Sequence, residues 1–209
     1  MEFLVTMTTR VPDGTPQEAV NDIRAREAVR ARELAAAGYL LRLWRPPLGP
    51  GEWRTLGLFA AADATELETV LASMPLRVWR TDEVTPLSPH KNDPAAGWPA
   101  VGPAVAEFHT TFTVAFPDGT ARETAADALA QEARRARELA GEGHLIRLWG
   151  LPPEGGAARA LGLWAARDID EMHAFVASLP LDRLGFMTTQ VTPLSPHPSD
   201  PAGAGGRHP

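Results

Sequence analysis

In the first half of the chain, the pattern of apolar and polar positions predicts a definite succession of strands and helices. From Phe3 to Thr8 the residues alternate between two distinct faces, which is the period-two signal of a β-strand. A Pro-Asp-Gly turn at 12–14 precedes Thr15, which is predicted to cap a helix that runs to Gly38. Two strands are predicted at 39–45 and 53–60, a second helix at roughly 63–73, and a last strand near 80–85.

The second half repeats this order. The segment 3–15 realigns with 108–120, and 31–44 realigns with 136–149 with 10 of 14 positions identical. The hexapeptide Thr-Pro-Leu-Ser-Pro-His recurs at 85–90 and 192–197, and the match continues beyond it. The chain is therefore a tandem duplication, and the segment after the first repeat is partly that repeat's own tail.

The repeated order, βαββαβ, predicts an α+β fold built from ferredoxin-like modules. The predicted boundaries are module 1 at 1–88, a Pro/Gly-rich linker that is also the tail of repeat 1 at 89–105, module 2 at 106–195 and a C-terminal tail at 196–209. Helices cover only one face of such a sheet, so the modules are expected to pack as an intrachain pseudo-dimer, sheet against sheet. Contact through the helices is the competing arrangement.

The composition of the chain argues against several kinds of binding partner and site. A net charge of -6 argues against a nucleic-acid surface, and the chain has no cysteine for disulfides, thiolate metal sites or a thiol nucleophile. No apolar run reaches the ~18 residues of a membrane span, and the N-terminus has no signal-peptide pattern. The chain is expected to be cytoplasmic, with a small molecule as its partner, neither nucleic acid nor membrane, and with a homo-oligomer possible.

Each long helix carries a glutamate in its apolar stripe. Glu27 lies four residues after Ile23 and four before Ala31, and Glu132 occupies the same place in the second repeat. A carboxylate directed at the core must be protonated, paired or solvated. These two glutamates are either general bases or members of structural ion pairs, with Arg42 and Arg147 as the expected partners.

Arginine and tryptophan recur on one predicted strand face, at Arg42 with Trp44 and at Arg147 with Trp149. Together they could bind a carboxylate and an unsaturated ring, or they could be an arginine packed over a core tryptophan. His109 lies on the more polar face of its strand, and His144, the counterpart of Tyr39, begins the next one. No histidine spacing indicates a metal site, and no phosphate loop or dinucleotide motif is present, so no metal or cofactor is expected.

In these features the chain resembles the muconolactone isomerases. Members of that family are about one repeat long, begin with a strand that carries a histidine, and have an inward helix glutamate before a Leu-Trp-Arg segment and a His-Pro tail. Glu27 and Glu132 match the helix glutamate, and His109 matches the strand histidine, where repeat 1 has Leu4. Trp44 with Arg45 matches the Leu-Trp-Arg segment, and His197-Pro198 matches the tail.

The resemblance implies a fold of the dimeric α–β barrel type, no cofactor, and a proton-transfer shift of a double bond in an unsaturated lactone, with the helix glutamate as the base. The repeats differ at Leu4/His109, Tyr39/His144, Arg45/Gly150 and Trp53/Ala158. Arg45 and Trp53 could bind an anion. A diverged isomerase or cyclase for another unsaturated metabolite, and a non-catalytic small-molecule binder, stay open.

The second repeat is expected to matter more for catalysis. Both repeats keep the glutamate, but only the second adds two imidazoles, at His109 and His144, that can exchange protons near neutral pH.

Overall fold

The computed structural model describes residues 1–94 and 105–204, which form two compact units. Unit 1 contains residues 1–87 together with the tail from Ser195, and unit 2 contains residues 88–194. Each unit is thus completed by the tail that follows the other repeat.

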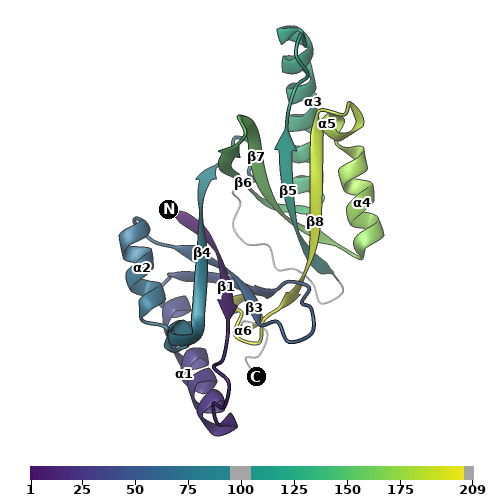
Figure 1. Ribbon diagram of the computed structural model, residues 1–209. Coiled ribbons are helices and arrows are strands. Elements are labelled where there is room, and N and C mark those ends of the chain that lie inside the picture. The colour runs from purple at the N-terminus through teal and green to yellow at the C-terminus, as the bar shows by residue number, and fades with distance from the viewer. Residues whose placement is uncertain (95–104, 205–209) are drawn as a thin grey trace. The chain divides into compact units, whose positions relative to one another are not determined.

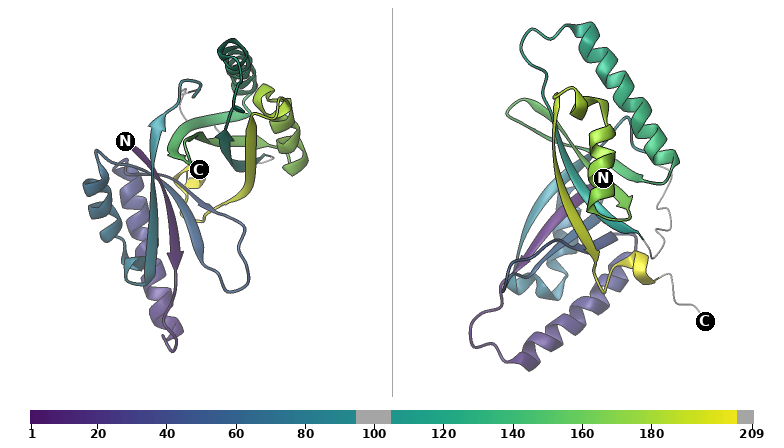
Figure 2. Two further views of the ribbon diagram at one scale, coloured as in Figure 1. Left: turned by 45° about the horizontal axis from the view of Figure 1, so that its top comes forward. Right: turned by 90° about the vertical axis from the view of Figure 1, so that its right-hand side faces the viewer.

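Unit 1 has the predicted order of elements (Figure 1). They are β1 (Glu2–Thr9), α1 (Gln17–Ala36), β2 (Leu40–Arg45), β3 (Arg54–Ala60), α2 (Ala64–Ala72), a 3₁₀ turn η1 (Pro75–Trp79) and β4 (Arg80–Pro89). The antiparallel strands run in the order β4-β1-β3-β2, and α1 and α2 cover one face of the sheet (Figure 2). This is the ferredoxin-like arrangement.

Unit 2 repeats this order, with the short helix α5 in the place of η1. Its elements are β5 (Ala106–Val114), α3 (Arg122–Gly141), β6 (Leu145–Glu154), β7 (Ala157–Ala166), α4 (Ile169–Ser178), α5 (Pro180–Arg183) and β8 (Met187–Pro196); the tail that follows forms α6 (Pro201–Ala204), which belongs to unit 1. The strand order is β8-β5-β7-β6.

The helix termini differ in part from the prediction. Thr15 does not cap α1: its hydroxyl donates to the Pro12 carbonyl and closes the preceding turn, and Pro16 takes the cap position without a side-chain hydrogen bond. Gly38 confirms the predicted C-terminal cap, because it adopts φ +80° and the Tyr39 N–H returns to the Leu34 carbonyl. The same pair of features recurs at Thr120 and Gly143.

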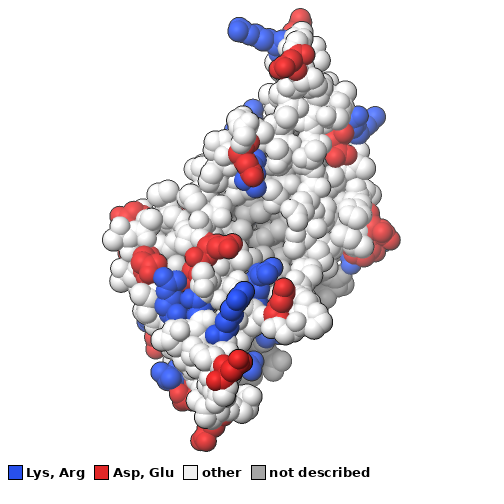
Figure 3. Space-filling view, in the orientation of Figure 1, with Lys and Arg blue, Asp and Glu red and all other residues white. Residues whose placement is uncertain are grey.

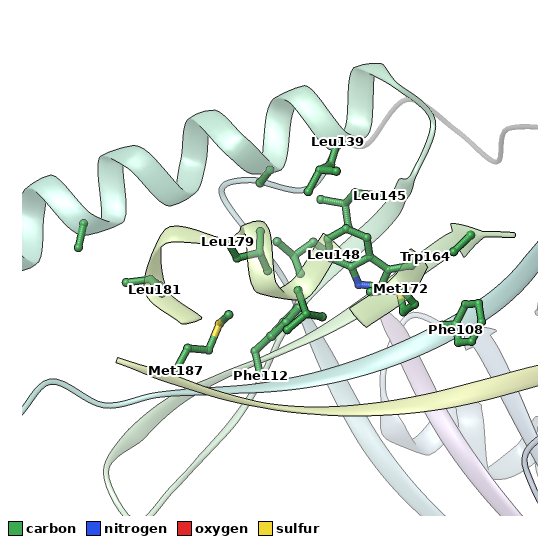
Figure 4. Packing of buried hydrophobic residues seen from close by; sticks show 14 residues of the cluster. Phe108, Phe112, Leu139, Leu145, Leu148, Trp164, Met172, Leu179, Leu181 and Met187 are labelled. Atoms are coloured by element: carbon green, nitrogen blue, oxygen red, sulfur yellow. The ribbon is translucent and has the colours of Figure 1, made fainter. Parts of the chain in front are cut away.

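The core of each unit lies between its helices and its sheet. In unit 1, Ile23 and Ala31 of the predicted α1 stripe are buried, as is Leu34 one turn later, and Ala31 and Leu34 pack with Phe3, Val5 and Met7 of β1. In unit 2, Figure 4 shows Phe112 and Met187 on their strands directed toward the layer of α3 and α5, beside Trp164 and Leu148. Gly162 admits this packing, because a Cβ there would collide with the Trp164 ring and the Thr110 hydroxyl.

The tails pack against the units, and each forms an ion pair through an aspartate. In unit 1, Ser195 and Pro196 pair with β2, and Asp200 forms an ion pair with Arg42. In unit 2, Ser88 and Pro89 pair with β6, and Asp93 forms an ion pair with Arg147. The recurrence of the tail in the sequence thus has a structural counterpart in both units.

Candidate functional site

The Glu27 carboxylate lies at the wall of a cavity of about 280 Å³ in unit 1. Helix α1 presents Glu27 toward the sheet because the residue falls between the buried Ile23 and Ala31. Glu27 Oε2 accepts the Leu76 backbone N–H at 2.8 Å, and Oε1 lies 3.0 Å from the Arg80 guanidinium. Burial raises the Glu27 pKa above its ordinary value, although the Leu76 hydrogen bond and the Arg80 charge oppose the shift.

The ion pair expected between Glu27 and Arg42 is not present, and Arg80 is the partner instead. The alternation along β2 gives the reason. Leu43 and Arg45 line the Glu27 cavity, so Arg42 and Trp44 lie on the other face of the strand. There the Arg42 guanidinium lies 4.8 Å from the Trp44 ring and pairs with Asp200.

Two more of the expected residues, Arg45 and Trp53, line the Glu27 cavity. Arg24 lines it as well, and its guanidinium lies 5.4 Å from the Trp53 ring. With Arg80, three arginines therefore line the cavity beside one glutamate. An anionic small molecule is favoured in such a site, and the indole offers a flat apolar surface.

The tail adds His197 to this cavity. The Ser199 backbone N–H donates to Nδ1 of His197 at 3.1 Å, so a neutral ring carries its proton on Nε2. Burial, followed by the charge of Arg45, lowers the His197 pKa to about 4. His197 is consequently a neutral hydrogen-bond donor at physiological pH.

The equivalent place in unit 2 is a cavity of about 850 Å³ with Glu132 in its wall. The Leu181 backbone N–H donates to Glu132 Oε2 at 2.9 Å. Within residues 1–94 and 105–204, Glu132 forms no ion pair, because Met187 stands where unit 1 has Arg80. Burial raises the Glu132 pKa, and the charge of Asp182 acts in the same direction.

The two imidazoles that the sequence adds to repeat 2 are not among the residues that line the Glu132 cavity. Phe108, Thr110 and Phe112 face the helices, so His109 lies on the opposite face of β5. His144 lies at the start of β6, where its Nδ1 is 3.2 Å from the Ala165 carbonyl and its ring packs on Phe175.

The remaining expected residues also lie away from the cavities. The Tyr39 hydroxyl donates to Glu66. Arg147 lies 4.7 Å from the Trp149 ring and pairs with Asp93 on the face of β6 away from Leu148 and the Glu132 cavity.

Sequence reasoning missed three residues of the Glu27 cavity. Arg24 could have been found, because it lies three residues before Glu27 and therefore on the same side of the helix. His197 carried a signal in the recurring tail, but the sequence did not show that this tail belongs to unit 1. No pattern in the sequence around Arg80 indicated that this residue would line the cavity.

Among the described residues, no cluster of three or more histidine and acidic side chains could hold a metal ion, and no helix is long and apolar enough to cross a membrane. On the face drawn in Figure 3, basic side chains gather in the lower middle of the view, with acidic side chains beside them.

Solved structures confirm the fold class. The chain is similar to a heme-binding protein from Thermus thermophilus, with 14% identity, a TM-score of 0.58, and coverage of 95% of this chain and 93% of the other. Chlorite dismutase from Candidatus Nitrospira defluvii matches with 10% identity, a TM-score of 0.58, and coverage of 93% and 91%. At these identities the likeness concerns the fold alone, which is α+β with two ferredoxin-like modules of the dimeric α–β barrel type.

The family comparison covers both repeats. The family model described as muconolactone delta-isomerase matches residues 1–93 and 106–200. Muconolactone Delta-isomerase 1 from Acinetobacter lwoffii is 33% identical over 90 residues, which are 43% of this chain and 91% of the relative. The relative is thus about one repeat long, as the duplication requires. The chain belongs to the muconolactone delta-isomerase family.

Proposed function

We propose that this protein is a cofactor-free isomerase that moves a carbon–carbon double bond in a small unsaturated lactone or a related acid, and that the Glu27 cavity of unit 1 is its active site. One observation carries the proposal: a partly buried carboxylate of raised pKa and an arginine-rich wall line the same cavity. A double-bond shift in an anionic lactone needs a base, an anchor for the anion and a donor for the carbonyl oxygen.

Glu27 is the proposed base. Its carboxylate takes a proton from a carbon next to the double bond, so that a C–H bond breaks and an O–H bond forms on Glu27. The electron pair moves toward the lactone carbonyl as a dienolate. Glu27 then returns the proton to a different carbon, and the double bond ends in its new position with no net change in oxidation state.

The other residues of the cavity account for binding and for stabilising the dienolate. Arg45 and Arg24 hold the substrate carboxylate, and Trp53 packs against the unsaturated ring. His197 donates its Nε2–H to the carbonyl oxygen, where negative charge develops. A neutral imidazole suits this role, because an imidazolium would give its proton away.

This proposal places the catalytic site in repeat 1, whereas the sequence favoured repeat 2. That expectation was based on His109 and His144, and neither lines the Glu132 cavity. Both cavities hold a glutamate and a tail histidine, His197 in unit 1 and His90 in unit 2, but the wall of three arginines belongs to the cavity of unit 1.

Turnover of muconolactone, followed by ultraviolet absorbance and repeated in deuterated water, tests the proposal. We expect isomerisation, with deuterium from solvent incorporated in the product at the carbon that accepts the proton. A chain that binds the lactone but neither isomerises it nor exchanges its protons would be a binding protein, and the proposal would fail.

A further inference from the structure

The cavity of unit 2 differs chemically from the cavity of unit 1, although both lie at the same place in their modules. It has about three times the volume, 850 Å³ against 280 Å³. Such a volume accommodates a drug-sized molecule rather than a single small lactone. The proposed isomerisation does not use this second cavity.

The arginines that line the first cavity are replaced in the second. Leu129 stands in place of Arg24, Met187 in place of Arg80, and Gly150 in place of Arg45. At Gly150 a Cβ would collide with the Ser88 hydroxyl, so no side chain fits there without a shift of Ser88. Ala158 takes the place of Trp53, so the indole that lines the first cavity is replaced by a methyl group in the second.

Apolar side chains form most of the wall of the second cavity. Phe112, Leu148, Trp164, Leu181 and Met187 all line it, and Figure 4 shows them converging between the strands and the helices. Each of these side chains is buried. The little surface that they expose faces the cavity and is apolar, so an apolar ligand suits this wall better than a charged one.

Charged groups at this cavity either lie at its edge or are paired. Lys91 and Asp118 are exposed, and the Arg159 guanidinium forms an ion pair with Glu154 at 2.8 Å. In addition, the Arg159 Nε–H is buried without a hydrogen-bond partner among the described residues. Glu132, with one backbone hydrogen bond and no cation, is the acidic group of the interior.

We propose that the Glu132 cavity binds an uncharged, largely apolar small molecule that forms a hydrogen bond with Glu132 through a hydroxyl, amine or amide N–H group. A carboxylate ligand would meet Glu132 without the three arginines that offset Glu27 in unit 1. The two repeats therefore bind ligands of different chemical class, an anionic one in unit 1 and an uncharged one in unit 2.

Two fluorescent probes with the same aromatic skeleton test this inference. N-phenyl-1-naphthylamine is uncharged, and 8-anilinonaphthalene-1-sulfonate adds only a sulfonate. We expect the uncharged probe to bind the full-length chain with one site per chain, and the sulfonate to bind that site at least about tenfold more weakly.

Variants of unit 2 locate the site. Leu129→Arg and Ala158→Trp each introduce the residue type of the first cavity, and each should weaken binding of the uncharged probe at least about tenfold. Arg45→Gln in unit 1 is the matched control and should leave probe binding unchanged. Ala158→Trp, at an exposed position, should keep the wild-type melting temperature, and both unit 2 variants should keep the wild-type rate of lactone turnover.

Tighter binding of the sulfonate at this site, or probe binding that both unit 2 variants leave unchanged, would overturn the inference. Probe binding is measured without lactone, so this result is independent of the proposed isomerase activity.

Discussion

Asp200 accepts hydrogen bonds from the Arg42 guanidinium and from the Leu43 backbone N–H, although 158 residues separate Arg42 from Asp200. The side chains are only 7% and 2% exposed, so this pair fastens the C-terminal tail to unit 1 in a nearly dry environment. The Asp200 backbone N–H also donates to the His197 carbonyl at 2.8 Å. The ion pair therefore positions the segment that carries His197 into the Glu27 cavity.

Asp200→Asn is expected to destabilise the protein, because it leaves the buried Arg42 without this carboxylate. Breaking a buried ion pair from one side costs about 3 kcal/mol, which corresponds to a fall in melting temperature of roughly 6–12 °C. Asp93→Asn in unit 2 is the matched variant and should cost less, because its pair with Arg147 is 11% and 13% exposed. Differential scanning calorimetry of the two variants checks the order, and a larger loss for Asp93→Asn would contradict it.

Arg45→Gln should raise the KM for an anionic lactone roughly 10- to 100-fold, the value of one charge-assisted hydrogen bond of about 1.5–3 kcal/mol. The kcat should change less, because Arg45 binds the carboxylate in substrate and transition state alike. Arg45 is exposed, so its loss should leave the melting temperature unchanged. Steady-state kinetics separate the two parameters, and an unaltered KM would exclude Arg45 as the anchor.

His197 should stay neutral over the whole working range of pH. Its pKa falls from 6.5 to about 4 on folding, so the unfolded chain binds this proton more tightly than the folded one. The corresponding stability is present above pH 6.5 and is lost as the pH falls toward 4. An NMR titration of the His197 ring protons should show no transition near 6.5, and a transition there would contradict the role of His197 as a neutral donor.

Glu132→Gln should stabilise the protein at neutral pH. Burial raises the Glu132 pKa, so ionisation costs folding free energy as the pH rises from 4.5 through the raised pKa. Glutamine can still accept the Leu181 N–H but has no charge to bury. We expect a higher melting temperature than wild type at about pH 7.5 and a vanishing difference at about pH 4. A lower melting temperature at the higher pH would show that the carboxylate is stabilised by its surroundings.

Much of the fold could be predicted because it depends on local sequence patterns, and these patterns occur in both repeats. Alternation at 3–8 predicts β1, and the apolar spacing around Ile23 and Leu34 predicts the buried side of α1. Gly38 marks the end of α1 because a left-handed residue is needed there. The cap at Thr15 was wrong because its hydroxyl had a nearer acceptor, the Pro12 carbonyl.

The site was predicted only in part because much of it depends on pairing between distant segments. The helical spacing identified Glu27, but the partner of Glu27 comes from β4, 53 residues later. The alternation of β2 predicted that Arg42 and Trp44 lie on one face of the strand. It did not show that Arg45, and not Arg42, lies on the strand face that lines the Glu27 cavity. The polar character of its strand face placed His109 opposite Phe108 and Phe112, as in the structure, but it did not show what that face contacts.

The kcat of two matched variants, Glu27→Gln and Glu132→Gln, tests the central claim most directly. Both substitutions keep the shape of the side chain and remove the base, at equivalent positions of the two repeats. We predict that Glu27→Gln lowers kcat for muconolactone by roughly 10²–10⁴-fold, the usual contribution of a positioned acid–base group, and that Glu132→Gln lowers it less than about threefold. A large loss confined to Glu132→Gln, or a loss in neither variant, would contradict the assignment of Glu27 as the base.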